Sequence, residues 1–458
     1  MNTDKIKGSL YGMLVGDALA VPGHWFYSPS NIRAEYGNIE GMVAAKPYHS
    51  ESMVQGMSYE GSIDIMHDKA SFYEGNTLAK KAQELEALQE EEGEEGLSKE
   101  EVEKSLRDDH GNFVGTKASR RVHYHRSLLK GQNTANACIA RLAMRYLGSA
   151  NAGGSDRYHP EQFLDALYNY MIRPPAKNPS DDKDQLINHN DTYLDVYLRG
   201  FFTNASQGKA LRDCVKDQRD AWSIGSIDGV AMAIPIIAAY AHESDWYVVG
   251  RAVEHAHLTH RSITVTASLS ILVPLLLNLY RQPTPDNPEQ AAAVLREALD
   301  GATSKMAPPK VTGRQMRDSY VSHKGPHNIP NEDKWKQHME LHATESTKDL
   351  IHRMLEWDDE DVAGHGERPD SRLSTMCYCE HTFTVALYFA FKYAADPRKA
   401  LLQNVMVGGH STSRGAVLGA ILGAAHGSDA IPFRDELCAK TAIDKEIDEL
   451  LATVAKPE

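Results

Sequence analysis

Apolar residues recur along the chain at intervals of three and four far more often than they alternate with polar ones. That spacing places apolar side chains on one face of a helix, whereas alternation is typical of a strand. Helices are predicted over about Asp4–Leu19, Ala135–Leu147, Gly229–Ala241, Trp246–Ala256, Ser262–Tyr280, Thr382–Ala394 and Gly415–Ala425. We therefore predict an all-α fold, built as a compact globule of many helices.

The first predicted helix carries glycines at a spacing of four, Gly8, Gly12 and Gly16. Glycine destabilises a helix by about 1 kcal/mol relative to alanine, so three on one face need a structural reason. The last predicted helix, Gly415–Ala425, is also rich in alanine and glycine. Both patterns predict a bare helix face that a neighbouring helix or a ligand approaches closely.

Polar stretches separate the predicted helices. Residues 84–112 are rich in acids and include Glu90-Glu91-Glu92, which predicts a solvated insert. Residues 312–370 and Pro174–Asp184 are polar and predict surface loops. Since neither a repeat nor a linker divides the chain, we expect one domain over 1–458 with inserts at 84–112 and 312–370.

The composition limits the kinds of binding partner and the cellular location that we expect. The 458 residues carry a formal net charge of −14, which disfavours nucleic acid and anionic membranes as partners. The longest apolar run, Leu269–Leu277, is broken by Ser270 and Pro274 and is far shorter than the roughly 20 residues of a membrane span. The N-terminus lacks a secretory pattern, and the five cysteines are scattered, so we expect reduced thiols and a cytoplasmic protein.

Three short segments combine polar side chains with glycine: Gly16–His24, Gly131–Ala137 and Gly408–Gly415. Asp17 follows the glycine-rich face of the first helix, where it is either a site residue or a surface acid near the helix end. Thr134 is either a site residue or the N-cap of the helix that follows it. The third segment precedes a helix N-terminus, whose free N–H groups suit an anion, although a plain capping loop has the same pattern.

In order and spacing these segments resemble the ADP-ribosylglycohydrolase family, which includes the J1-type crystallins. The family's N-terminal G-D-A-L-G-x-P-x-E motif is matched by Gly16, Asp17, Ala18, Leu19 and Pro22. Its later motifs are matched by Gly131 and Thr134, by Gly229 and Met232 with Pro235 one position early, by Thr259-His260, and by Gly408, Gly409, Gly419, Gly423 and Ala424. The resemblance implies a compact all-α globule that hydrolyses ADP-ribose from a side chain with two magnesium ions held by Asp pairs.

This sequence departs from the family at the positions of the metal ligands. The two Asp motifs read Thr134-Ala135-Asn136-Ala137 and His410-Ser411-Thr412-Ser413, and the Glu that closes the first motif is His24. The family's Asn and Arg in a further motif are Asp228 and Ala233. Because magnesium prefers carboxylate oxygens, we predict that the magnesium pair is lost and that no other cofactor replaces it.

Three interpretations of the altered site stay open. A single softer metal could be bound by His24 and His410, with or without Asp17, since imidazole suits zinc, iron or nickel. Alternatively, His24 or His410 could act as acid or base without metal, with Arg414 binding a carboxylate or phosphate. In the third interpretation no catalysis remains, as in the crystallin branch.

We favour a hydrolase or lyase that acts on a small polar substrate, of which nucleotide-like and sugar-like molecules are examples, in a cleft lined by His, Asn and Arg. The catalytic candidates are Asp17, His24, Asn136 and His410. The substrate-binding candidates are Thr134, Asp228, Gly408, Gly409, Ser411, Thr412, Ser413 and Arg414. A catalytic site predicts an open cleft where these meet, whereas a structural or binding relative predicts polar groups tied to one another; an ADP-ribosyl hydrolase with a rebuilt metal site is the remaining alternative.

Two further clusters have less specific patterns. His255, His257 and His260 lie at a helix end, where His257 and His260 could share a face and a metal. His189-Asn190-Asp191-Thr192 resembles a displaced acidic motif, but we interpret Asp191 as the N-cap of a helix over Tyr193–Phe202.

Overall fold

The computed structural model describes residues 1–52, 123–149, 158–173, 179–215, 225–309, 345–364 and 373–454. The acidic segment predicted at 84–112 lies outside these ranges. The α-helices are α1 (Thr3–Ala20), α2 (Pro29–Tyr36), α6 (Ala135–Ser149), α7 (Pro160–Ile172), α8 (Val196–Ser206), α9 (Asp228–Met232), α10 (Ile234–Ala239), α11 (Asp245–Ala256), α12 (Ile263–Arg281), α13 (Pro288–Thr303), α16 (Thr347–Met354), α17 (Asp359–Val362), α18 (Cys379–Lys392), α19 (Pro397–Met406), α20 (Ser411–His426) and α21 (Lys440–Val454). The described strands are β1 (Ala363–Gly364) and β2 (Leu373–Ser374), which pair in parallel, so the all-α prediction is confirmed.

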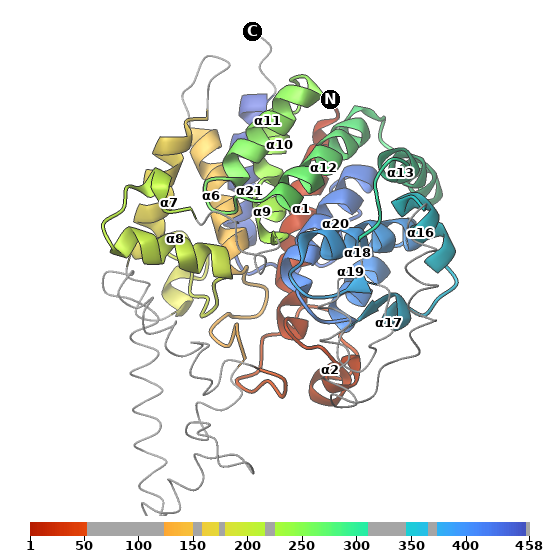
Figure 1. Cartoon of the computed structure of the whole chain (residues 1–458), viewed down its shortest axis with the longest axis horizontal. Coiled ribbons are helices and arrows are strands. Elements are labelled where there is room, and N and C mark those ends of the chain that lie inside the picture. The colour runs from red at the N-terminus through yellow and green to blue at the C-terminus, as the bar shows by residue number, and fades with distance from the viewer. Residues whose placement is uncertain are drawn as a thin grey trace, which may run out of the picture.

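Helices α1 and α20 lie side by side at the centre of the molecule (Figure 1). They run antiparallel and meet through glycines, because Gly12 faces Gly419 and Gly16 faces Gly415. A Cβ atom on Gly12 would lie 1.9 Å from the carbonyl oxygen of Gly419. The glycine spacing of α1 therefore reflects a helix partner, and the two backbones touch where a side chain would keep them apart.

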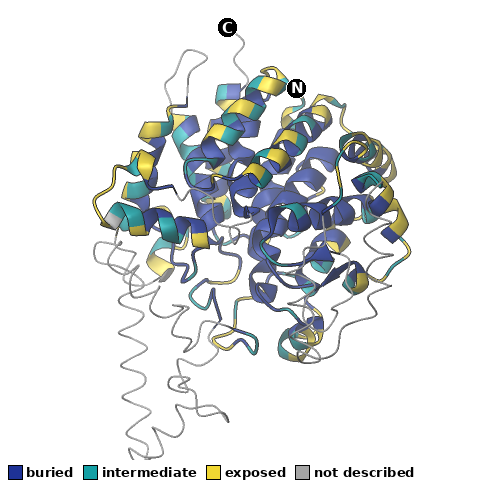
Figure 2. Ribbon diagram, in the orientation of Figure 1, coloured by how far each residue is buried: buried dark blue, intermediate teal, exposed yellow. Residues whose placement is uncertain are grey.

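Both central helices are almost entirely buried (Figure 2). The other helices surround them and contribute to one continuous cluster of buried apolar side chains that extends from α1 to α21. At its edge, α6 and α21 are joined by an ion pair in which Arg141 donates two hydrogen bonds, of 2.8 and 2.9 Å, to Glu446. The end of α1 and the starts of α6, α9 and α20 meet around one interior region, where hydrogen bonds join them.

Two predicted elements differ from the structure. The helix predicted over Gly229–Ala241 is divided into α9 and α10, because Pro235 starts a new helix in its first turn. The described part of the loop predicted over 312–370 contains α16, which buries Leu350, Ile351 and Met354 and is fixed by a capping box at Ser346 and Asp349. A loop is therefore wrong for those residues.

Helix α12 is long and apolar enough to cross a membrane by length and composition, and it is the one helix in the described ranges that meets this test. It packs against α11, α13, α18 and α20, and 56% of its most apolar window is buried inside the protein. That environment is typical of a core helix of a globular protein.

Candidate functional site

Asp17 lies near the end of α1 and ties it to the start of α6. Its carboxylate accepts hydrogen bonds from the Thr134 hydroxyl (2.6 Å), the Thr134 backbone N–H (2.9 Å) and the Asn133 amide (3.0 Å). Burial raises the pKa of Asp17 to about 6, although these hydrogen bonds oppose the shift. Asp17 and Thr134 thus hold two helices together, and the distance from the Ala137 N–H to the Thr134 hydroxyl, 3.5 Å, makes Thr134 at most a weak cap.

The loop before α20 depends on two glycines. Gly408 and Gly409 both have φ near +66°, and a Cβ on Gly409 would lie 2.1 Å from the Thr375 carbonyl oxygen. The loop is bound to the segment after α1, because Trp25 donates to the Gly409 carbonyl (2.8 Å) and Gly409 donates to Phe26 (2.6 Å). Trp25 has φ 64°, a strained value for a bulky residue. This pairing places His410 directly beside His24.

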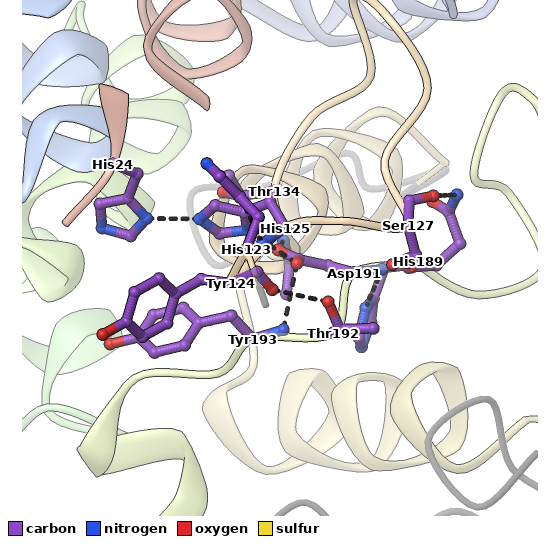
Figure 3. A network of polar contacts seen from close by, with 12 residues as sticks. His24, His123, Tyr124, His125, Ser127, Thr134, His189, Asp191, Thr192 and Tyr193 are labelled. Carbon is purple, nitrogen blue, oxygen red and sulfur yellow. Dashed lines mark hydrogen bonds and ion pairs between the residues drawn. The ribbon is translucent and has the colours of Figure 1, made fainter. Parts of the chain in front are cut away.

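Three histidines form a continuous buried chain between two aspartates. The Nε2 atom of His24 lies 3.1 Å from Nδ1 of His410, and its Nδ1 contacts Nε2 of His125. His410 Nε2 lies 2.8 Å from Asp228, and His125 Nδ1 lies 2.8 Å from Asp191. Figure 3 shows His24 and His125 facing one another, with Asp191 beyond His125. The structure therefore brings the predicted residues His24, His410 and Asp228 together.

Asp228, at the start of α9, is surrounded by donors. Its Oδ1 accepts from the Asn136 amide (2.7 Å) and the Ser413 hydroxyl as well as from His410, while Oδ2 accepts from Ser226. Burial alone would raise the pKa of Asp228, but the interaction with His410 and these hydrogen bonds outweigh burial and hold the pKa below its usual range. Asp228 is thus an ionised carboxylate at the centre of the site.

Two acceptor atoms beside Asp228 lack donors among the described residues, namely Asn136 Oδ1 and Asp195 Oδ2. Both side chains are more than nine-tenths buried. The other Asp195 oxygen, Oδ1, accepts from the first turn of α8 and lies 3.1 Å from His260. Asp195, rather than the predicted Asp191, is the N-cap of this helix, and the helix begins at Val196.

The remaining residues of the α20 loop lie behind the site. Arg414 donates to the Asn404 side chain (2.6 Å) and to the carbonyl oxygens of Asn404 and Gly408 (2.8 and 2.7 Å). Burial lowers its pKa to about 9, and no carboxylate in the described ranges pairs with it. Ser411 donates to the Ala20 carbonyl (3.0 Å), and Thr412 is buried. Arg414 therefore holds the loop and does not join His24, Asn136 and His410.

Two more buried histidines support the chain of three. His49 Nε2 lies 3.0 Å from the His24 carbonyl oxygen, and His123 Nε2 lies 3.3 Å from that of Pro22. Burial lowers the pKa of His49 to about 4 and the pKa of His123 well below its usual value. Burial and the neighbouring imidazoles do the same to the pKa of His24. These three rings are neutral at physiological pH.

Aromatic side chains cover the histidines. Trp25 stacks on His24 (ring centroids 5.1 Å apart) and lies 5.0 Å from His410. Trp25 and Tyr124 form a small cluster apart from the main core, with Tyr27, Tyr193 and Cys377 packed against it. His24 and His410 are each 1% exposed. A ligand can reach them only if the side chains that cover them move.

Asp195, Asp228 and His260 are the described group whose ligand atoms lie close enough, within 4.8 Å of one another, to hold a metal ion. Both Asp228 oxygens and one Asp195 oxygen already accept hydrogen bonds, so this set fits a metal ion poorly. His24 and His410 fit no better, because the ring nitrogens of each face another imidazole or a carboxylate.

The histidines at the end of α11 point in different directions. His255 Nδ1 contacts the Tyr158 hydroxyl, His257 Nε2 lies 2.9 Å from the Thr266 hydroxyl, and His260 faces Asp195. They do not form one metal site. The described cavity of about 710 Å³ is lined by residues of α7, α11 and the loops beside them, including His159, Arg212, His257 and Arg261, and by none of the three histidines of the buried chain.

Sequence reasoning missed His123, His125, His49 and Asp195, and it gave Asp191 another role, that of a helix N-cap. The alternating pair His123-Tyr124-His125 is the sequence signal that could have pointed to this region. Its meaning depends on contacts across 101 residues to Pro22 and His24, and no local pattern encodes such contacts.

Comparison with known proteins gives one family match. A family model described as ADP-ribosylglycohydrolase matches residues 81–458. Among solved structures, a chain described as "ADP-ribosylglycohydrolase-related protein complex" is similar at 14% identity and a TM-score of 0.43, with 99% of this chain and 98% of that chain covered. A search of curated proteins gave no match.

Proposed function

The chain belongs to the ADP-ribosylglycohydrolase family, and we propose that it is a divergent hydrolase or lyase that works without the family's two magnesium ions. Its substrate is a small polar molecule, and its chemistry is centred on Asp228 and His410. The family match supports the fold and the general class of reaction. The contacts around Asp228 support the change of mechanism.

The residues at the expected metal positions do not fit two magnesium ions. Asn136 and Ser413 both donate hydrogen bonds to Asp228, and His410 presents nitrogen where the family has a carboxylate. Magnesium needs near-octahedral oxygen coordination and usually one or two free carboxylates. Asp228 is the one acid in this group, and its oxygens are occupied by the donors that surround it.

The observation that carries the proposal is the pair of buried acceptors next to Asp228. An unpaired buried acceptor costs about 1–3 kcal/mol, so Asn136 Oδ1 and Asp195 Oδ2 favour a ligand that brings hydrogen-bond donors. Hydroxyl, amine and amide groups, or a water molecule, supply them. A small molecule with several hydroxyl or amino groups therefore suits the site.

The paired His410 and Asp228 can supply a proton to a leaving group. Cleavage of a substrate bond leaves an atom that needs a proton, and a carboxylate–imidazole pair is a common donor. In hydrolysis, water then adds to the substrate carbon and returns its surplus proton to the pair. Access requires movement of the aromatic cluster, whose Trp25 is held in a strained backbone conformation of the kind found at functional sites.

A structural, crystallin-like relative is the second candidate, and burial favours it. His24 and His410 are nearly inaccessible, and the ring nitrogens of each have partners within the protein. A protein that uses this network only to stabilise its fold would have the same contacts. The two candidates differ in whether a ligand enters beside Asp228.

Turnover assays on a panel of nucleosides, glycosides and ADP-ribose, with and without EDTA, separate these candidates. Our proposal predicts turnover of a hydroxyl-rich compound that survives EDTA and falls in Asp228→Asn. Turnover that requires magnesium would contradict it. Absence of both turnover and binding across the panel would favour the structural candidate. Asp300→Asn, which alters an exposed His–Asp pair with His352, is the matched control.

A further inference from the structure

We propose that Asp191, His125, His24, His410 and Asp228 form a buried proton relay that holds one proton more than three neutral imidazoles carry. The relay includes two positioning residues, His125 and Asp191, that lie at the end remote from Asp228. The proton count follows from the hydrogen bonds alone. Its use in catalysis rests on the function proposed above.

Both ends of the relay are carboxylates that accept hydrogen bonds. Asp191 accepts from the Ala135 N–H (2.9 Å), the Tyr193 N–H (3.1 Å) and His125. Burial alone would raise the pKa of Asp191, but the interaction with His125 outweighs burial and lowers it. Asp228 accepts from two hydroxyls and an amide in addition to His410. Each terminal imidazole must therefore direct an N–H towards its aspartate.

The proton count follows from these ends. Four links join the five residues: Asp191 to His125, His125 to His24, His24 to His410, and His410 to Asp228. Each link needs one hydrogen between its two atoms, and neither carboxylate brings one, so four ring protons are required. A neutral imidazole has one N–H, so three neutral rings supply only three. The fourth proton makes one ring an imidazolium.

The extra proton resides at the ends of the relay. Both ring nitrogens of His24 face imidazoles, and its pKa is lowered well below the usual value by burial and by its neighbours. His125 and His410 each contact a carboxylate, so an imidazolium at either end lies beside an opposite charge. Moving the charge from His125 to His410 requires only that two protons shift along the hydrogen bonds of His24.

Other titratable groups face the relay but do not supply the missing proton. Three charged groups act on the ends of the relay: Asp17 interacts with His125, Arg126 interacts with Asp191, and Asp195 lies beside Asp228. His49 and His123 are neutral. The remaining neighbours are Tyr27, Tyr124, Tyr193, His189, His260 and Cys377. The negative charges of Asp191 and Asp228 are thus partly balanced by the positive charge that the extra proton gives to the relay.

In the proposed reaction the shared proton is the acid. When it moves to the His410 end, Asp228 and His410 hold the proton that the leaving group takes. Three neutral rings then remain until water returns a proton. Asp191 acts from the far end, because its negative charge keeps the extra proton in the relay.

Nuclear magnetic resonance of the ¹⁵N-histidine-labelled full chain tests the relay directly. We expect one of the three rings to carry two ring N–H groups at neutral pH, as separate or averaged signals, with exchange-protected, downfield N–H protons. Signals are assigned with His125→Gln and His410→Gln. Three singly protonated rings in the wild type would overturn the proposal, whatever the assay results.

Asp191→Asn supplies a second test. The new amide can donate to His125 as well as accept, so three neutral rings then complete the chain, and we expect loss of the imidazolium signal. Persistence of that signal in a folded variant would overturn the proposal. Asp300→Asn should leave it unchanged. An imidazolium in a protein without turnover would retain the relay and refute only the proposed function.

Discussion

The imidazole of His410 lies 2.8 Å from the carboxylate of Asp228, although 182 positions separate the two residues in the sequence. The pair exists because the Gly408–Gly409 turn and the start of α9 meet beside α1. Asp228, a predicted substrate-binding residue, is therefore the centre of the candidate site.

Replacing Asp228 by Asn should remove the carboxylate that pairs with the proton-donating His410. We expect turnover of any substrate found to fall at least about 10²-fold, the usual contribution of a general acid or base. The amide would also meet the donors Ser226, Ser413 and Asn136 with its own N–H, so some loss of stability is expected. Rates should be measured on variants whose circular dichroism matches the wild type. Undiminished turnover in Asp228→Asn would contradict the assignment.

The contact between α1 and α20 predicts a large difference between two glycine substitutions. Gly12→Ala places a methyl group against the Gly419 backbone and should lower the free energy of unfolding by about 1–3 kcal/mol or more. Gly250→Ala, in the exposed face of α11 with open space around it, should instead raise it by about 1 kcal/mol. Urea unfolding measures both. Equal effects would show that the helices do not touch as described.

The buried histidines predict acid sensitivity of the fold. His49 has a pKa of about 4 when folded and about 6.5 when unfolded, so the unfolded chain binds more protons between these values. Its contribution to stability is present above pH 6.5 and is lost as the pH falls towards 4. His49→Gln should reduce the slope of unfolding free energy against pH by up to about 1.4 kcal/mol per pH unit. His352→Gln, at an exposed site, is the matched control.

We expect Arg414 to stabilise the fold and not to bind a negatively charged ligand. Arg414→Lys loses the guanidinium bonds to Asn404 and Gly408, and we expect unfolding free energy to fall by about 2 kcal/mol. Arg398→Lys, at the surface, should change it by less than about 0.5 kcal/mol. If Arg414→Lys instead left stability intact and abolished binding of a carboxylate or phosphate, the original binding role would be restored.

Local patterns predicted the fold well because they record helix periodicity. The spacing of Gly8, Gly12 and Gly16 predicted the close approach of a neighbouring helix or a ligand. Several helices lie within a few residues of their predicted bounds, namely α1, α6, α11, α12 and α20. The division at Pro235 and the helix at Thr347–Met354 were missed because short helices have too few repeats to show a period.

The site was only partly predictable. The resemblance indicated that His24, Asn136 and His410 would converge, since it aligned them with motifs of one site. His125 comes from a segment that matches no motif, and Asp191 comes from one that only resembles a displaced acidic motif. Their role arises only when the chain brings distant loops together. Arg414 was predicted to bind the ligand, but its guanidinium donates to the backbone of Asn404 behind the loop. The sequence alone does not show in which direction this side chain points.

The central claim is that this family member works without magnesium. Calorimetric titration of the purified full chain with Mg²⁺, followed by turnover assays in EDTA, tests it most directly. We predict no stoichiometric magnesium binding and turnover that is unchanged by EDTA. Two bound magnesium ions per chain, or activity that EDTA abolishes and magnesium restores, would contradict it.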